Sequence, residues 1–159
     1  MFNFKKKKQN QIFAAMNGEI VDIEKVPDEA FAQKMLGDGV AISPSDGNVY
    51  SPVDGVVEDV TQTLHAYCIR SDDGLDVLIH VGINTVELKG EGFDVKVKAG
   101  DTVKKGDLLA KADLSLIKEK GYETYTPILI TNMHVIKDIN CKTGSAKATE
   151  TEVISYSLA

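Results

Sequence analysis

The feature that most constrains the fold is a series of short strand-forming runs separated by closely spaced turn signals. The expected strands are Gly18 to Ile23, Val40 to Ile42, Val49 to Ser51, Val56 to Gln62, Ala66 to Arg70, Leu75 to Val81, Phe93 to Val97, Leu108 to Ala112, Ile128 to Thr131 and Glu152 to Tyr156. Turn residues gather at 45–48, 53–55, 99–101 and 105–107. Evenly spaced strands with scarce helix are typical of an antiparallel sandwich or barrel. We therefore expect an all-β, antiparallel β-sandwich or barrel-like fold.

Helices are expected to be short and few, one over residues 28–35 and one over 114–120. The chain has 159 residues, of which 43% are hydrophobic. A chain of this size buries about 68–70% of its unfolded surface in one core. The sequence therefore predicts a single domain over 12–159, preceded by a flexible basic tail over 1–11.

Composition also limits the setting and the partners. The sequence shows no signal-peptide pattern, no apolar run near 18 residues and no pairing pattern for Cys68 and Cys141, which favours the cytoplasm. With 18 basic and 24 acidic residues, the net charge of −6 disfavours nucleic-acid binding and suits a partner with a basic docking face. Lys5 to Lys8 form a basic cluster, for which weak contact with an anionic membrane surface is an alternative to a solvated tail.

Two histidines, His65 and His80, flank one predicted hairpin turn at 71–74. A two-residue loop at 72–73 places His65 opposite His80, and a loop at 73–74 places Tyr67 opposite His80. Either register keeps both histidines on one face, whereas an odd-length loop sends them to opposite faces. Alternation along the second strand turns His80 toward the less apolar side. We therefore expect two imidazoles close enough to bind one small group.

The pair suits phosphoryl transfer. A neutral imidazole is a competent nucleophile near pH 7 because its ordinary pKa is about 6.5. Phosphoryl transfer requires mainly positioning and charge stabilisation, which a second imidazole supplies by donating a hydrogen bond. Thr63 shares the face of His65, so its hydroxyl is expected to orient that ring, although an ordinary strand threonine explains the residue equally well.

Metal binding is the competing chemistry. A catalytic zinc site takes three protein ligands and a structural site four, and the sequence supplies no third ligand near this pair. His134 is the one other histidine, and neither His-Glu-x-x-His nor His-x-His occurs. We expect no metal and no other cofactor, but a weak zinc site completed by a partner's carboxylate stays open.

The segment from Leu78 to Phe93, LIHVGINTVELKGEGF, resembles the phosphorylation-site signature of the glucose-type enzyme IIA family of bacterial sugar phosphotransferase systems. Further segments resemble that family in type and order, from about residue 12 to the end. They are Gly18 to Val21, Val26 to Asp28, Gly37 to Gly39, Ala41 to Ile42, Pro52 to Gly55, Thr63 to Ala66 and Thr126 to Pro127. The resemblance implies a sandwich of two related hybrid motifs. A weak sequence similarity between residues 16–23 and 53–60 agrees with this.

The resemblance also implies roles for the site. His80 is the phosphohistidine, formed through Nε2, His65 stabilises the phosphoryl group, and Thr63 is hydrogen-bonded to His65. It implies that the protein accepts phosphate from the phosphocarrier protein HPr and donates it to the IIB domain of a sugar permease. Asn84 departs from the pattern, since many relatives have aspartate there, and an amide cannot form an ion pair with a basic partner.

Three functions therefore stay open. They are a phosphoryl carrier, a regulatory binding module of the same fold, and a zinc hydrolase on a related sandwich, which the missing His-x-His disfavours. For the carrier we expect a flat apolar rim around His80 made by Leu78, Val81 and Ile83, because several partners must reach one phosphohistidine. A monomer is the simpler expectation for a protein that shares one face among partners.

Overall fold

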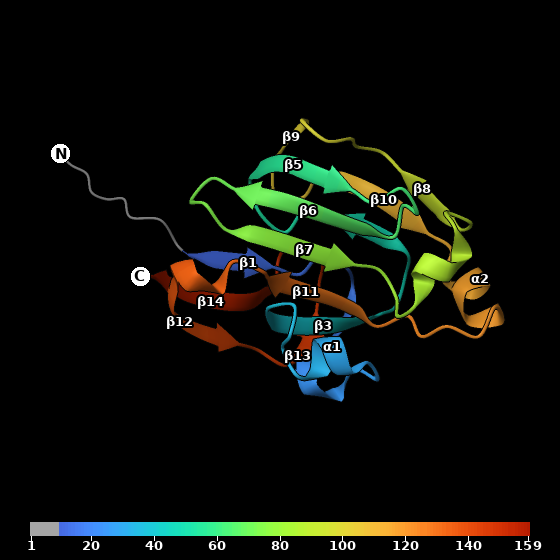
Figure 1. The fold of residues 1–159 in the computed structure, drawn as a ribbon, viewed down its shortest axis with the longest axis horizontal. Helices are drawn as coiled ribbons and strands as arrows, with labels where there is room; N and C mark the ends of the chain where they lie inside the picture. The colour runs from blue at the N-terminus through green and yellow to red at the C-terminus, as the bar shows by residue number, and fades with distance from the viewer. Residues whose placement is uncertain (1–9) are drawn as a thin grey trace.

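The computed structural model describes residues 10–159, which form three antiparallel sheets (Figure 1). The large sheet has the strand order β13-β2-β3-β11-β7-β6-β5-β9, and the two small sheets have the orders β1-β14-β12 and β4-β10-β8. The strands are β1 (Gln11–Phe13), β2 (Gly18–Asp22), β3 (Asp38–Pro44), β4 (Asn48–Tyr50), β5 (Gly55–Val60), β6 (Ala66–Ser71), β7 (Asp76–His80), β8 (Phe93–Val95), β9 (Thr102–Val103), β10 (Leu108–Ala112), β11 (Thr126–Ile130), β12 (Ile136–Cys141), β13 (Gly144–Ala146) and β14 (Glu152–Leu158). The helices are α1 (Glu29–Ala32), α2 (Leu114–Glu119) and the short 3-10 turns η2 (Ile23–Lys25), η3 (Thr85–Leu88) and η4 (Met133–Val135).

The expected all-β sandwich is confirmed, and within residues 10–159 no sheet closes into a barrel. Each of the ten predicted runs contains a strand. Four strands were not predicted: β1, β9, β12 and β13. β1, β9 and β13 have only two or three residues, and β13 reads Gly-Ser-Ala, which has low strand propensity. β12 is an edge strand with no fully buried residue, so it shows no alternation between apolar and polar positions.

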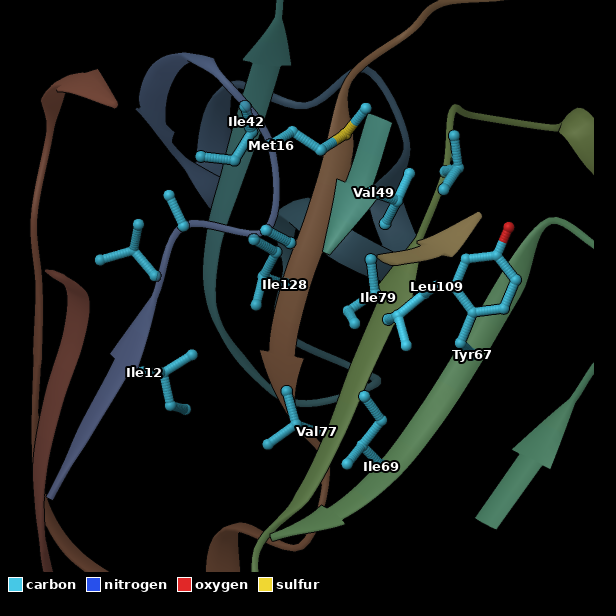
Figure 2. Packing of buried hydrophobic residues seen from close by; sticks show 14 of the residues in the cluster. Ile12, Met16, Ile42, Val49, Tyr67, Ile69, Val77, Ile79, Leu109 and Ile128 are labelled. Carbon is cyan, nitrogen blue, oxygen red and sulfur yellow. The ribbon is translucent and has the colours of Figure 1, made fainter. Parts of the chain in front are cut away.

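Alternation on β7 separates two layers of apolar packing. Val77 and Ile79 are fully buried in the main core between the sheets (Figure 2), while Leu78 and His80 point to the outer face of the large sheet. On that outer face a smaller cluster packs beneath η2 and α1. Its buried members are Ile23, Val26, Phe31, Ala41, Ile83 and Leu129. His80 therefore stands at the border between a rigid sheet and a small covering layer.

The covering helix α1 is shorter than the predicted 28–35. Asp28 caps its first turn by accepting a hydrogen bond from the Ala30 amide at 2.9 Å, as its residue type favours. The helix ends because Lys34 adopts a left-handed φ of +59°, and the Met35 amide then donates to the Ala30 carbonyl at 3.0 Å. This early end turns Met35 out toward solvent. The second helix, α2, agrees with the predicted 114–120 to within one residue.

The hairpin between β6 and β7 differs from both predicted registers. Its loop has three residues, 72–74, closed by a hydrogen bond from the Ser71 amide to the Leu75 carbonyl at 2.8 Å. Gly74 takes a φ of +91° as the third loop residue, which is the usual way to close a loop of this length. The two-residue loops were therefore the wrong prediction, and Ala66 is the residue that pairs with His80.

Residues 1–9, most of the predicted basic tail, lie outside the described residues. Gln11, the last residue of that predicted tail, begins β1 and pairs with Ser155 of β14. In residues 10–159 no helix has both the length and the apolar character that a membrane crossing requires.

The loop geometry gives a stability prediction. Gly74→Ala is expected to lower the free energy of unfolding by about 1–2 kcal/mol, because the side chain meets open space but the φ of +91° disfavours any Cβ. Asp72→Ala is the control, since its exposed side chain lies in the same loop, and it should change stability by less than about 0.5 kcal/mol. Urea unfolding measures both variants. Equal stabilities would contradict the left-handed conformation of Gly74.

Candidate functional site

His80 is the last residue of strand β7, and its ring is hydrogen-bonded to the backbone of Gly82, two residues later in the chain. Nδ1 lies 2.8 Å from the Gly82 carbonyl oxygen. Because a carbonyl only accepts, Nδ1 must carry the proton, which leaves the lone pair on Nε2. Gly82 allows this turn through its φ of +80°. A Cβ there would lie 2.5 Å from the Thr85 side chain and 3.0 Å from the Glu123 carbonyl.

His65 lies in a bend immediately before β6 and is buried, with 5% of its surface exposed. Its carbonyl accepts a hydrogen bond from the Val81 amide at 2.7 Å. Its Nδ1 is hydrogen-bonded to the Thr63 hydroxyl at 2.8 Å, with the Thr61 hydroxyl farther away at 3.4 Å. The predicted contact between Thr63 and His65 is therefore present in the structure.

The two imidazole rings lie together, with centroids 4.7 Å apart and planes at 82°. This happens although the odd hairpin loop would send two regular strand residues in these positions to opposite faces. The rule fails here because His65 stands outside the strand and follows Leu64, whose left-handed φ of +64° redirects the chain. The expectation of a shared face survives, but not for the expected reason.

Electrostatics keep both rings neutral near pH 7. Burial, and next the neighbouring His80 ring, lower the pKa of His65 from 6.5 to about 4. Burial also lowers the pKa of His80, an effect that its hydrogen bond to Gly82 and the nearby Asp28 carboxylate partly offset. Two neutral rings side by side provide a free lone pair on His80 Nε2 and, when the Thr63 hydroxyl donates to His65 Nδ1, one N–H donor on His65 Nε2.

Three residues of the site were not predicted. The Phe31 ring of α1 packs edge-on against His80 at a centroid distance of 5.0 Å, and Asp28 at the start of that helix contributes a negative charge. Gly82 supplies the carbonyl that fixes the tautomer. Asp28 and Gly82 lie in segments that resemble the family, Val26 to Asp28 and Leu78 to Phe93, but no role was predicted for either. Phe31 gave no signal, because the packing of α1 onto the outer face of the sheet cannot be seen in local sequence.

The apolar rim differs from the prediction. Val81 and Ile83 are buried, with 0% and 2% exposure, and Leu78 is half-buried. Val81 follows the strand alternation into the core, and Ile83 is covered by the smaller outer cluster. Within residues 10–159, Val56 and Leu158 are exposed away from His80, and three other exposed apolar residues lie in the segments that follow α1 and β7. They are Met35 (69% exposed) and Leu36 (45%) after α1, and Val86 (45%) in η3.

Asn84 has a local reason for its residue type. It opens η3 with a left-handed φ of +62°, a conformation that asparagine and aspartate tolerate better than other residues with a side chain. Asparagine therefore preserves the backbone turn after His80, and its exposed side chain lacks the charge that aspartate would add.

Within residues 10–159 no third histidine, cysteine, aspartate or glutamate joins the pair in a group suited to a metal ion. His134 is exposed in η4, beside the hairpin loop, where Asn132 contacts Gly74, and β7 separates that loop from His80. Burial raises the pKa of the Cys68 thiol to about 11, which disfavours the thiolate that binds metals.

Comparison with known proteins identifies relatives along the whole chain. Residues 10–136 match the family model described as phosphoenolpyruvate-dependent sugar phosphotransferase system, EIIA 1. The PTS system glucose-specific EIIA component of Halalkalibacterium halodurans is 44% identical over 164 residues, covering 98% of this chain and 95% of the relative. The PTS system glucose-specific EIICBA component of Staphylococcus carnosus is 49% identical over 123 residues, covering 77% of this chain and 18% of the relative.

A solved structure shares the fold. Glucose permease IIA from Mycoplasma capricolum superposes with a TM-score of 0.87 at 34% identity, covering 97% of this chain and 99% of that chain. The fold and the sequence thus lead to the same relatives.

The lowered pKa of His65 predicts a pH dependence of stability. Between pH 6.5 and about 4 the unfolded chain binds a proton at this position that the folded chain does not. The free energy of unfolding should therefore fall as the pH is lowered through this window, and His65→Gln should reduce the slope.

Urea unfolding at several pH values tests this. His134→Gln is the control, because that side chain is exposed outside the site and its loss should leave the slope unchanged. An equal slope in wild type and His65→Gln would contradict a neutral, buried His65.

Proposed function

Since the chain belongs to the EIIA 1 family of the phosphoenolpyruvate-dependent sugar phosphotransferase system, we propose that it carries the phosphoryl group on His80 Nε2, with His65 and Thr63 assisting the transfer. At the level of the family, the protein is a phosphoryl carrier in sugar uptake and a phosphotransferase component. The observation that supports the assignment to His80 is the hydrogen bond from Nδ1 to Gly82, which leaves Nε2 free beside a second imidazole.

In the proposed reaction the Nε2 lone pair attacks phosphorus of the phosphorylated donor. A new N–P bond forms while the bond between phosphorus and the donor breaks. The ring becomes electron-poor when phosphorus binds, and the Gly82 carbonyl stabilises the Nδ1 proton at that stage. Because burial keeps His80 neutral, no general base is needed to free the nucleophile.

His65 is proposed to stabilise the transferred group. When the Thr63 hydroxyl donates to Nδ1, the proton of the neutral His65 ring is on Nε2 and is available to a phosphoryl oxygen. A hydrogen bond to a charged group contributes about 1.5–3 kcal/mol. Thr63 therefore acts on phosphate through the tautomer of His65 and not by direct contact.

The donor is proposed to be the phosphocarrier protein HPr, and the acceptor the IIB domain of a sugar permease. The Staphylococcus carnosus relative combines IIC, IIB and IIA components in its name, which supports an acceptor of the IIB type. Both partners must reach His80 in turn, and the exposed Met35, Leu36 and Val86 supply apolar contacts around it. Asp28 and the net charge of −6 suit basic partner surfaces.

One accessible face shared by successive partners also supports a monomer acting in the cytoplasm. Membrane contact by Lys5 to Lys8 stays a prediction, since these residues lie outside the described part of the chain.

The first test is transfer from phosphorylated HPr. His80→Gln should take up no stable label, because the nucleophilic nitrogen is removed. His65→Gln should take up label but pass it to a IIB domain about 10- to 100-fold more slowly, the loss expected from 1.5–3 kcal/mol of charge stabilisation.

His134→Gln is the matched control and should transfer at the wild-type rate, since its side chain lies outside the site. Folding of each variant is checked by circular dichroism and thermal unfolding. Stable label on His80→Gln would overturn the assignment of the phosphorylated residue.

The second test concerns docking. Leu36→Asp places a charge on the proposed partner surface and should raise the KM for phosphorylated HPr about five- to thirtyfold with little change in kcat. Leu158→Asp makes the same chemical change on a side chain with 39% exposure at the end of β14, and it should leave KM unchanged. A fall in kcat alone for Leu36→Asp would contradict a docking role.

A further inference from the structure

Tyr67 is the largest fully buried side chain of the described residues, and its hydroxyl is hydrogen-bonded to the bend that contains His65. The side chain is fully buried, and Figure 2 shows its ring beside Leu109 with the hydroxyl oxygen at the end away from Ile69. That hydroxyl donates to the Leu64 carbonyl at 2.8 Å. Burial raises the pKa of Tyr67, so the hydroxyl keeps its proton and remains a donor.

Leu64 is the residue that redirects the chain into His65. Its left-handed φ of +64° is unfavourable for a residue with a Cβ and persists only when surrounding contacts enforce it. The Leu64 amide donates to Thr61 at 2.9 Å, and the side chain packs over Gly90. The bond from Tyr67 adds a restraint on the carbonyl side, from a residue that the core itself immobilises.

We propose that Tyr67 is a positioning residue for phosphoryl transfer, which acts through the Leu64 carbonyl to hold the bend that places His65 beside His80. The inference rests on the proposed function and adds to it a residue that touches neither imidazole. Without the hydroxyl, the bend at 63–65 is less restrained, and the Thr63 contact to His65 Nδ1 loosens with it.

The chain contains a matched control in Tyr156. Its hydroxyl is also hydrogen-bonded, to Asp73 Oδ2 at 2.5 Å, and its side chain is 9% exposed. This bond lies at the hairpin loop, at the opposite end of β7 from His80. Tyr156→Phe therefore removes the same hydroxyl oxygen from another buried tyrosine. The hydrogen bond that is lost goes to the Asp73 carboxylate, and the bend before β6 is not affected.

The experiment uses the full chain with ¹⁵N-labelled histidine. In Tyr67→Phe the ring ¹⁵N signals of His65 should shift or broaden, and its titration should move from about 4 toward 6.5 as the bend loosens. Tyr156→Phe should keep the wild-type His65 signals. Urea unfolding reports the stability lost in each variant, so that loss of position is separated from loss of stability.

Transfer from phosphorylated HPr to a IIB domain is measured on the same proteins. Tyr67→Phe should transfer phosphate about tenfold more slowly than wild type. This loss of rate is smaller than the 10²-fold loss that a displacement of about 1 Å can cause. The transfer rate of Tyr156→Phe should stay within about twofold of wild type. Unchanged His65 signals in Tyr67→Phe, or equal losses of rate in both variants, would overturn the inference. Wild-type protein that takes no phosphate would instead overturn the proposed function, and the NMR comparison would still decide the role of Tyr67.

Discussion

The removal of two adjacent imidazoles from water is the constraint on which the site depends. Burial lowers the pKa of both His65 and His80, and the neighbouring His80 ring lowers that of His65 further, because two charged rings with centroids 4.7 Å apart would repel each other. The neutral state provides both a nucleophile and a hydrogen-bond donor. Each role further requires a fixed tautomer, which the Gly82 carbonyl sets for His80 and which the Thr63 hydroxyl can set for His65.

The sheet meets this requirement by dividing its two faces. Val77 and Ile79 lock β7 into the main core, so the outward residue His80 has a rigid base. The covering layer on the outer face is small, and Phe31 is the part of it that contacts the His80 ring. Because this layer is small, it shields the imidazoles from water but leaves one edge of the site accessible. A phosphoryl group that is transferred between proteins requires such access.

Much of this was predictable because it follows the period of a strand. The alternation from Asp76 to His80 correctly placed His80 outward, and the ten predicted runs each contain a strand. The contact of Thr63 with His65 also matches the expectation. What escaped prediction through long-range contact is the exposed edge strand β12, the docking of Phe31 and the burial of Ile83. Val81 had also been expected at the rim, although the strand alternation itself turns it into the core.

The hairpin shows why a correct conclusion can rest on a wrong step. The three-residue loop shifts the register by one residue, which alone would separate the histidines, and the left-handed Leu64 just before β6 brings them together again. Gly74 closes the loop through its own backbone conformation, whereas the carbonyl of Leu64 in the bend accepts a hydrogen bond from the buried Tyr67. Two departures from regular geometry, with different causes, thus compensate at one pair of rings. A pairing rule applied to the strand alone describes neither of them, because the decisive residue lies outside the strand and its carbonyl is hydrogen-bonded to a tyrosine that packs in the core.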